Sequence, residues 1–95
     1  MRLKTPKVIL LGYNPHKKKW KVQVKIKVHV ADDVKACNMP LGLWGTEVEA
    51  ASVLRAFFGV GFTTGLFVMP TYPSKATLKD ACVAAIEAVA MELNT

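Results

Sequence analysis

Residues 19–30 alternate strictly between apolar and polar side chains over twelve positions. Successive side chains of a β-strand point to opposite faces, so this pattern predicts a strand with one buried face and one solvent-facing face. Four of the six solvent-facing positions are lysines. The apolar positions are Trp20, Val22, Val24, Ile26, Val28 and Val30, and the polar positions are Lys19, Lys21, Gln23, Lys25, Lys27 and His29.

A second strand is predicted directly before this one, because residues 7–13 are almost all apolar. The segment between the two strands contains Asn14 and Pro15, which favour a turn because asparagine bonds to its own backbone and proline fixes φ. Two strands joined by a short turn form an antiparallel hairpin. In the first strand Val8 and Leu10 share one side, and Ile9, Leu11 and Tyr13 share the other.

The connection from Ala31 to Gly45 shows no clear periodicity. Segments of this length without a strand or long helix are often functional or contain a short helix. Asp32 is placed to cap a single helical turn that ends at Cys37. Residues 39–45 are then expected to form an apolar loop.

A first helix is predicted to begin at Thr46–Glu49, a capping box in which Glu49 reaches back to the amide of the cap residue. Gly59 is expected to end this helix. Val60–Met69 is then interpreted as a buried strand ended by Pro70, with a tight hairpin at residues 63–65 as the alternative. The apolar stripe of the helix is Ala50, Val53, Leu54, Phe57 and Phe58.

A second helix is expected to start at Ser74 or Thr77. The predicted order is β-β-α-β-α in a single domain that covers residues 1–95. An α+β two-layer sandwich satisfies these patterns, with an antiparallel N-terminal hairpin and both helices on one sheet face. The apolar stripe of the second helix is Leu78, Ala81, Cys82, Ala85, Ile86, Val89 and Leu93.

Positive charge is concentrated near the N-terminus. Residues 1–31 hold nine basic and no acidic side chains, whereas residues 32–95 hold four basic and seven acidic ones. One surface is therefore expected to attract an anion. Apolar residues and glycine together exceed the share found in typical soluble domains. Part of this apolar surplus is expected to lie in a homo-oligomeric or partner interface.

The sequence lacks the common catalytic and cofactor motifs, including the Gly-x-Ser-x-Gly elbow, the His-Glu-x-x-His zinc motif and the Walker loop. The glycines of residues 59–65 follow a helix, whereas phosphate-binding loops follow a strand. His29, Asp32 and Asp33 are better explained as strand-end and capping residues than as metal ligands. A non-enzymatic protein with no cofactor and no metal is expected.

The sequence also shows no clear cysteine motif, signal peptide or membrane span. Cys37 and Cys82 have no CxxC partner, and no histidine is placed to act as base for a Cys37 nucleophile. The apolar run Val8–Leu11 is too short for a signal-peptide core. Glycines and prolines interrupt the uncharged stretch of residues 56–74, which makes a poor membrane span. We expect a reduced intracellular, cytoplasmic protein that does not enter a membrane.

The leading functional hypothesis concerns the lysine row, defined as Lys19, Lys21, Lys25 and Lys27. Alternate residues of a strand lie roughly 6.6 Å apart, so the row spans about 26 Å. Such a row is either a solvated face or a site for a polyanion, most of all a nucleic-acid backbone. Little sequence specificity is expected, because no aromatic residue lies between the lysines. The predicted anion-binding residues are Lys17, Lys18 and the four residues of the lysine row.

The alternative is a protein-interaction factor, such as a viral or plasmid-borne inhibitor or assembly subunit, that binds a partner through apolar surfaces. An acidic protein would also fit the positive face. Trp44 is then either a core plug, which its large buried area favours, or an exposed anchor. The predicted partner-interface residues are Ile9, Leu11, Tyr13 and Trp44.

Overall fold

A computed structural model of the chain describes residues 8–59, 61–62 and 69–94. Within these ranges the element order is β-β-β-α-β-α, with one more strand than the sequence patterns predict. The strands are β1 (Ile9–Asn14), β2 (Lys19–Val30), β3 (Asp33–Trp44) and β4 (Thr71–Tyr72), and the helices are α1 (Glu47–Phe58) and α2 (Lys75–Leu93).

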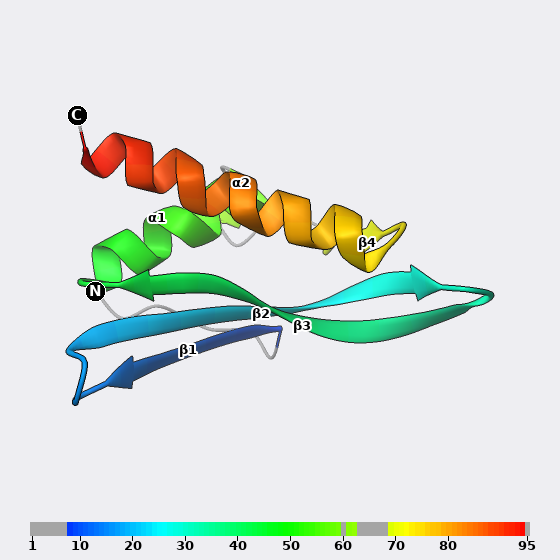
Figure 1. Ribbon diagram of the computed structural model, residues 1–95, viewed down its shortest axis with the longest axis horizontal. Coiled ribbons are helices and arrows are strands. Elements are labelled where there is room, and N and C mark those ends of the chain that lie inside the picture. The colour runs from blue at the N-terminus through cyan, green and yellow to red at the C-terminus, as the bar shows by residue number, and fades with distance from the viewer. Residues whose placement is uncertain (1–7, 60, 63–68, 95) are drawn as a thin grey trace.

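The strands form one sheet in the order β1-β2-β3, with every neighbouring pair antiparallel. The short β4 pairs in parallel with Lys27 and Val28 of β2. Both helices lie on the same side of the sheet (Figure 1). The predicted α+β two-layer arrangement, with an N-terminal antiparallel hairpin and two helices on one face, is confirmed.

The prediction of a short helical turn and a loop between Ala31 and Gly45 is wrong, because this segment is the twelve-residue strand β3. A two-residue turn at Ala31 and Asp32 connects it to β2, with Val30 opposite Asp33. The register shifts between Lys21 and Gln23, where β3 contains one extra residue: Leu41 and Gly42 lie opposite Val22 alone. Such a bulge reverses the side-chain alternation and so conceals the strand in the sequence.

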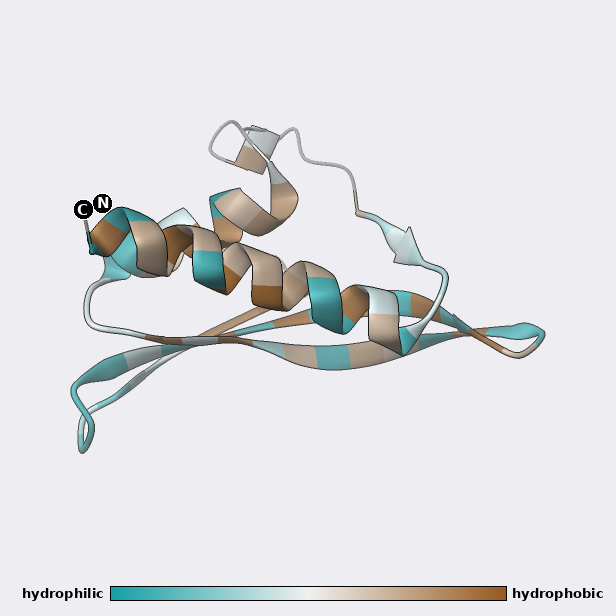
Figure 2. Cartoon of the chain, turned by 45° about the horizontal axis from the view of Figure 1, so that its top comes forward, coloured by the Kyte–Doolittle hydropathy of each residue, from teal (hydrophilic) through white to brown (hydrophobic). Residues whose placement is uncertain are grey.

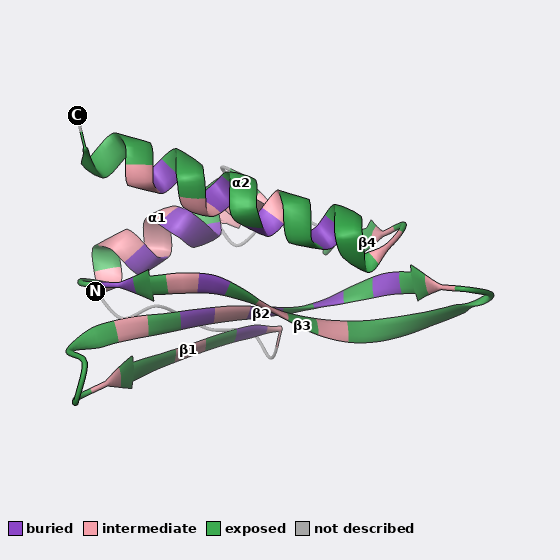
Figure 3. Cartoon of the chain, in the orientation of Figure 1, coloured by how far each residue is buried: buried purple, intermediate pink, exposed green. Residues whose placement is uncertain are grey.

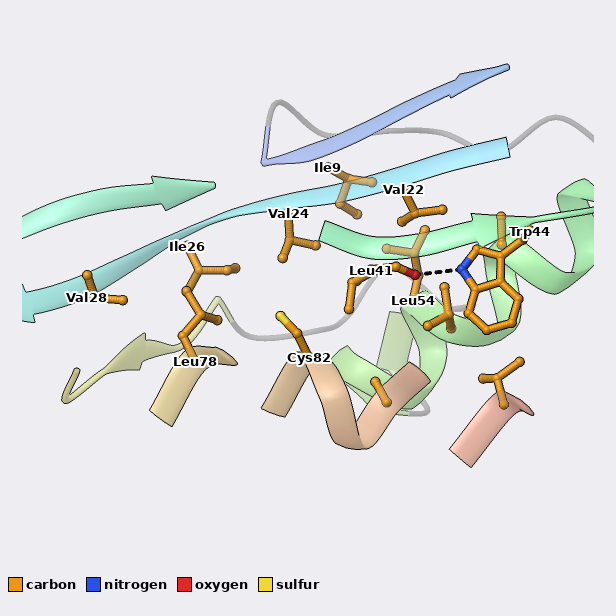
Figure 4. Packing of buried hydrophobic residues seen from close by; sticks show 14 residues of the cluster. Ile9, Val22, Val24, Ile26, Val28, Leu41, Trp44, Leu54, Leu78 and Cys82 are labelled. Carbon is orange, nitrogen blue, oxygen red and sulfur yellow. Dashed lines mark hydrogen bonds between the residues drawn. The ribbon is translucent and has the colours of Figure 1, made fainter. Parts of the chain in front are cut away.

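The bulge allows β3 to place Leu41 and Trp44 in the core. Gly42 has φ +90°, a left-handed conformation that favours glycine, and an added Cβ there would lie 3.3 Å from the Trp44 indole nitrogen. Leu41 and Trp44, three positions apart, are consequently both buried. The Trp44 Nε1–H donates a hydrogen bond of 2.6 Å to the carbonyl oxygen of Leu41 (Figure 4).

The strand predicted at Val60–Met69 lies largely outside the described residues, as does the alternative hairpin at residues 63–65. Gly61 and Phe62, which are described, belong to a short helical turn. Among the described residues, the next strand after α1 is Thr71–Tyr72, and Pro70 directly precedes it. Proline is tolerated at the beginning of a strand because no hydrogen bond of the sheet requires its missing N–H there.

The helix boundaries follow the predicted capping signals. The Thr46 hydroxyl accepts a 3.1 Å hydrogen bond from the Glu49 amide, and the Glu49 carboxylate accepts one of 3.1 Å from the Gly45 amide, one residue before the predicted donor. Gly59, at φ +90°, ends α1. Ser74 caps α2 by accepting a hydrogen bond from the Thr77 amide.

The core lies between the sheet and the helices, where β2 contributes its apolar side and each helix contributes one stripe (Figure 4). Leu54 of α1 and Leu78 of α2 are completely buried. Burial of an aliphatic side chain of this size stabilises a fold by roughly 1.5–3 kcal/mol. The completely buried β2 residues are Val22, Val24, Ile26 and Val28.

Candidate anion-binding face

The side of the sheet that faces away from the helices is called the open face here, and the other side the helix side. All four lysines of the lysine row lie on the open face and are exposed, because they alternate with the buried residues of β2. β2 is continuous from Lys19 to Val30, so the row is carried by one unbroken strand. The helices lie only on the helix side (Figure 3), so they do not cover the exposed lysine row.

Strand pairing places no acidic residue beside the lysine row in the described sheet. On β1, Asn14 is opposite Lys19 and Gly12 is opposite Lys21. On β3, the register places three more neighbours on the open face: Asn38 opposite Lys25, Ala36 opposite Lys27 and Leu43 opposite Lys21. Since no carboxylate competes for them across the ladder, the lysines are available to an external anion.

Lys17 and Lys18 lie in the turn that joins β1 to β2, and both are exposed. The Asn14 side-chain oxygen accepts hydrogen bonds from the amides of His16 and Lys17, at 3.0 and 3.2 Å. Lys18 has φ 54°, a left-handed conformation. The turn therefore holds its two lysines at the Lys19 end of the lysine row, where they extend the positive charge of the open face.

The open face also carries apolar side chains, as the pattern of the first strand implied. Leu10 of β1 is 42% exposed, Val34 of β3 is 43% exposed and Leu43 of β3 is 46% exposed. These residues flank the lysines on both neighbouring strands. A surface that mixes cations with exposed aliphatic groups is suited to contact with a macromolecule.

The four residues predicted as a partner interface all lie on the helix side, in different degrees of burial. Ile9 and Trp44 are buried in the core, and Leu11 is half-buried. Tyr13 is 49% exposed, and its ring lies 5.3 Å from that of Trp20. Of this set, only Tyr13 is exposed, with about half of its surface accessible to a partner.

A shallow groove of about 570 Å³ runs along β1 and the beginning of β2. Lys21 and Gln23 line it together with Leu10 and Gly12 of the open face. Enclosed pockets bury most of a small molecule, whereas this open groove would leave much of one exposed.

The two cysteines are free thiols on the helix side. Cys37 of β3 is half-buried and Cys82 of α2 is buried. Burial raises the pKa of the Cys82 thiol to about 11, and the charge of Cys37 adds to this effect. Burial also raises the pKa of Tyr72, with a contribution from the charge of Cys82. A high pKa keeps Cys82 protonated at neutral pH and makes it a poor nucleophile.

His29, Asp32 and Asp33 lie at the end of the β2–β3 hairpin and are exposed. The Asp33 carboxylate accepts a 2.8 Å hydrogen bond from the Val34 amide, a local backbone role. Within residues 8–59, 61–62 and 69–94, no three His, Cys, Asp or Glu side chains gather in a way that could hold a metal ion. None of the helices in that part of the chain is long and apolar enough to cross a membrane.

Comparison of the chain with protein families, with curated proteins and with solved structures gave no match.

Proposed function

We propose that this protein binds a polyanion through its open face, and that the polyanion is the backbone of a nucleic acid. The observation that carries the proposal is the lysine row, exposed on one continuous strand with no acidic side chain paired to it across the described sheet. Lysines at alternate positions of a strand meet phosphates as point charges and release condensed counterions when they do so.

The composition of the face indicates how such binding would work. On β1, β2 and β3 its described residues include no Phe, Tyr or Trp, and its one imidazole, His29, lies at the end of β2, so bases have little on which to stack. Lysine contacts to phosphates fix position but carry no sequence information. We therefore propose backbone binding with little sequence preference and with no catalytic step.

A salt titration with duplex DNA and with single-stranded RNA tests this proposal. For about four phosphate contacts on duplex DNA, the logarithm of affinity should fall with the logarithm of salt concentration with a slope of about −3.6. Changing Lys25 and Lys27 together to glutamine should weaken binding to all sequences alike and reduce the slope by about two units.

The matched control changes Lys75 and Lys79 of α2 to glutamine. These two lysines are also exposed, but they lie in the helix layer on the other side of the molecule. The control removes the same charge, so it separates a local site from a general effect of net charge. Equal weakening by the two double variants, or no binding at low salt, would overturn the proposal.

The exposed aliphatic residues of the open face favour an acidic protein as the second candidate. Leu43 lies opposite Lys21 and Leu10 lies opposite Gln23, and neither leucine would have a role in binding a nucleic-acid backbone. Changing Leu43 to serine should leave binding of nucleic acid almost unchanged if phosphate contacts dominate. A large loss of binding to an acidic protein in the same variant would favour the second candidate.

A further inference from the structure

The outer edge of β3 carries backbone groups that no described strand pairs with. Because two residues separate Val30 from Asp33, these two form a hydrogen-bonded pair, and bonded and non-bonded pairs then alternate along the hairpin. The amide and carbonyl groups of Val34, Ala36 and Asn38 consequently point away from β2. Pro40 occupies the next position of this kind, where its missing N–H costs the hairpin no hydrogen bond.

Two features that protect an edge strand, a proline and a bulge, are confined to one half of β3, whereas the other half carries the charges of Asp33 and Lys35. Pro40 and the bulge around Gly42 interrupt the edge near Trp44, and such devices normally prevent pairing with another chain. The half formed by residues 33–39 has neither device. Residues 33–36 are all exposed, and this end of the hairpin extends beyond the helix layer (Figures 1 and 2).

We propose that two copies of this chain pair through residues 33–39 of β3, antiparallel, about a two-fold axis at Ala36. In this register Ala36 is opposite its own copy and Val34 is opposite Asn38, so each outward N–H faces an outward C=O of the second copy. The Val34 amide exchanges its hydrogen bond to the Asp33 carboxylate for one across this contact. Lys35 is opposite Cys37 of the second copy, so no like charges face each other directly. An isologous contact of this kind closes as a dimer and leaves no further edge for growth.

Charge also favours a second copy at this edge over the other edge of the sheet. β3 carries one aspartate and one lysine, whereas the lysine row lies on β2. In the joined sheet the two β2 strands are three interstrand spacings apart, about 14 Å. This separation exceeds the Debye length of about 8 Å at physiological ionic strength, so repulsion between the two rows is largely screened.

Dimerisation changes the cationic surface that the open face presents to a ligand. Pairing through the edge makes one continuous sheet, with both helix layers on one side and both lysine rows on the other. Two antiparallel rows of cations then flank a strip formed by the two β3 strands. This consequence for ligand binding depends on the proposed function, whereas the pairing itself does not.

Pairing and nucleic-acid binding should respond to salt in opposite directions. The chain carries a net charge of +6, so bringing two copies together is opposed by repulsion that salt screens. The like charges nearest to the contact between the two β3 strands, called the seam below, are the two Lys35 side chains. They lie diagonally across this contact from each other. Sedimentation without nucleic acid should therefore show a species of about twice 10.4 kDa whose share rises with added salt.

The variant Ala36→Pro tests the seam, with Ala36→Ser as its matched control. Proline removes an outward N–H that the hairpin with β2 does not use, as Pro40 already does in the same strand. We expect Ala36→Pro to keep the helical and strand content of the wild type and to weaken dimerisation by at least about tenfold, because two hydrogen bonds are lost at the axis. Ala36→Ser keeps the N–H and should dimerise like the wild type.

Amide hydrogen exchange of the wild-type protein provides a test that needs no variant. As protein concentration rises from about 10 μM to about 500 μM, the amides of Ala36 and Asn38 should gain protection, since pairing covers them. The Val34 amide already donates a hydrogen bond to the Asp33 carboxylate and is not used as a reporter. The amides of Lys35 and Cys37 bond to β2 and should be protected at both concentrations. A monomer at the higher concentration, or a dimer in which the amides of Ala36 and Asn38 still exchange fast, would overturn the inference.

These readouts keep the two proposals apart. A salt-enhanced dimer that binds no nucleic acid would remove the proposed function and leave the pairing intact. Binding of nucleic acid by a strictly monomeric chain would do the reverse.

Discussion

The two sides of the sheet are built from the same strands and differ in what determines their residues. On β2, four completely buried aliphatic side chains alternate with the exposed lysines of the lysine row. Packing restricts which residues fit on the helix side, because protein interiors are close-packed and a change of one methylene group affects stability. The open face meets no such constraint, so its lysines are free to serve binding at little cost to stability.

A second difference runs along the β2–β3 hairpin. Near Trp44 the hairpin is covered by both helices, and the bulge directs Leu41 and Trp44 into the core. Near the Ala31 turn it extends past the helices, and residues 33–36 are exposed on both faces. The covered end stabilises the fold, whereas the extended end presents a free edge and is the part available to another chain.

The largest effect should come from comparing Trp44→Ala with Leu43→Ala, two adjacent residues on opposite sides of β3. Trp44 is 6% exposed and donates a hydrogen bond within the core, so its truncation should cost about 3–5 kcal/mol. Leu43 is 46% exposed on the open face, and its truncation should change stability by no more than about 0.5 kcal/mol. Urea denaturation measures both.

Similar losses in the two variants would contradict the division of β3 into a helix side and an open face. A small loss for Trp44→Ala alone would mean that the indole is not the core residue that its burial indicates.

An intermediate effect is expected on the reactivity of the two thiols. Cys82 lies at the centre of the helix side and Cys37 lies at its margin. Buried Cys82 should react with a thiol reagent only on unfolding, whereas half-buried Cys37 should react in the native state. One thiol per chain should therefore be modified rapidly, and Cys37→Ser should abolish that phase. Rapid modification of both thiols would show that α2 does not keep Cys82 buried.

The raised pKa of Cys82 also predicts a pH dependence. Below pH 9.0, the ordinary pKa of a thiol, Cys82 is protonated in both states and its contribution to stability is complete. Between this value and about 11, the unfolded thiol ionises and the folded one does not, so stability is lost as pH rises. Urea denaturation at about pH 8 and about pH 10.5 should show a larger loss for the wild type than for Cys82→Ala.

The sequence predicts elements well where one physical signal dominates. The strict alternation of β2 and the capping residues Thr46 and Ser74 placed a strand and two helices correctly. β3 was missed because three local effects disturb its alternation. Pro40 occupies a strand position, the bulge at Gly42 reverses the pattern, and Lys35 lies on the helix side where no helix covers it.

The candidate site divides in the same way. Periodicity alone places the lysine row on the face opposite the apolar residues, as observed. The neighbours of the row on β3 could not be predicted without that strand and its register. The free edge at Val34, Ala36 and Asn38 was therefore invisible from the sequence, although the short polar segment Ala31-Asp32-Asp33 is a turn signal that could have suggested a second hairpin.

The smallest effect on stability is expected at the Ala31 turn, at the end of the hairpin that the helices do not cover. Ala31 has φ 55°, a conformation that costs a residue with a Cβ about 1–2 kcal/mol and costs glycine almost nothing. Glycine also loses more entropy on folding, by about 0.5–1 kcal/mol, so Ala31→Gly should stabilise the protein by up to about 1 kcal/mol. For a domain of this size the melting temperature should rise by a few degrees, at about 4–8 °C per kcal/mol. The matched control is Ala36→Gly, the same substitution on extended backbone five residues later, where only the entropic term applies and the melting temperature should fall. A decrease in both variants would mean that the strain at Ala31 is smaller than the entropy lost by glycine, and that the free end of the hairpin is held by its strand pairing with little help from its turn.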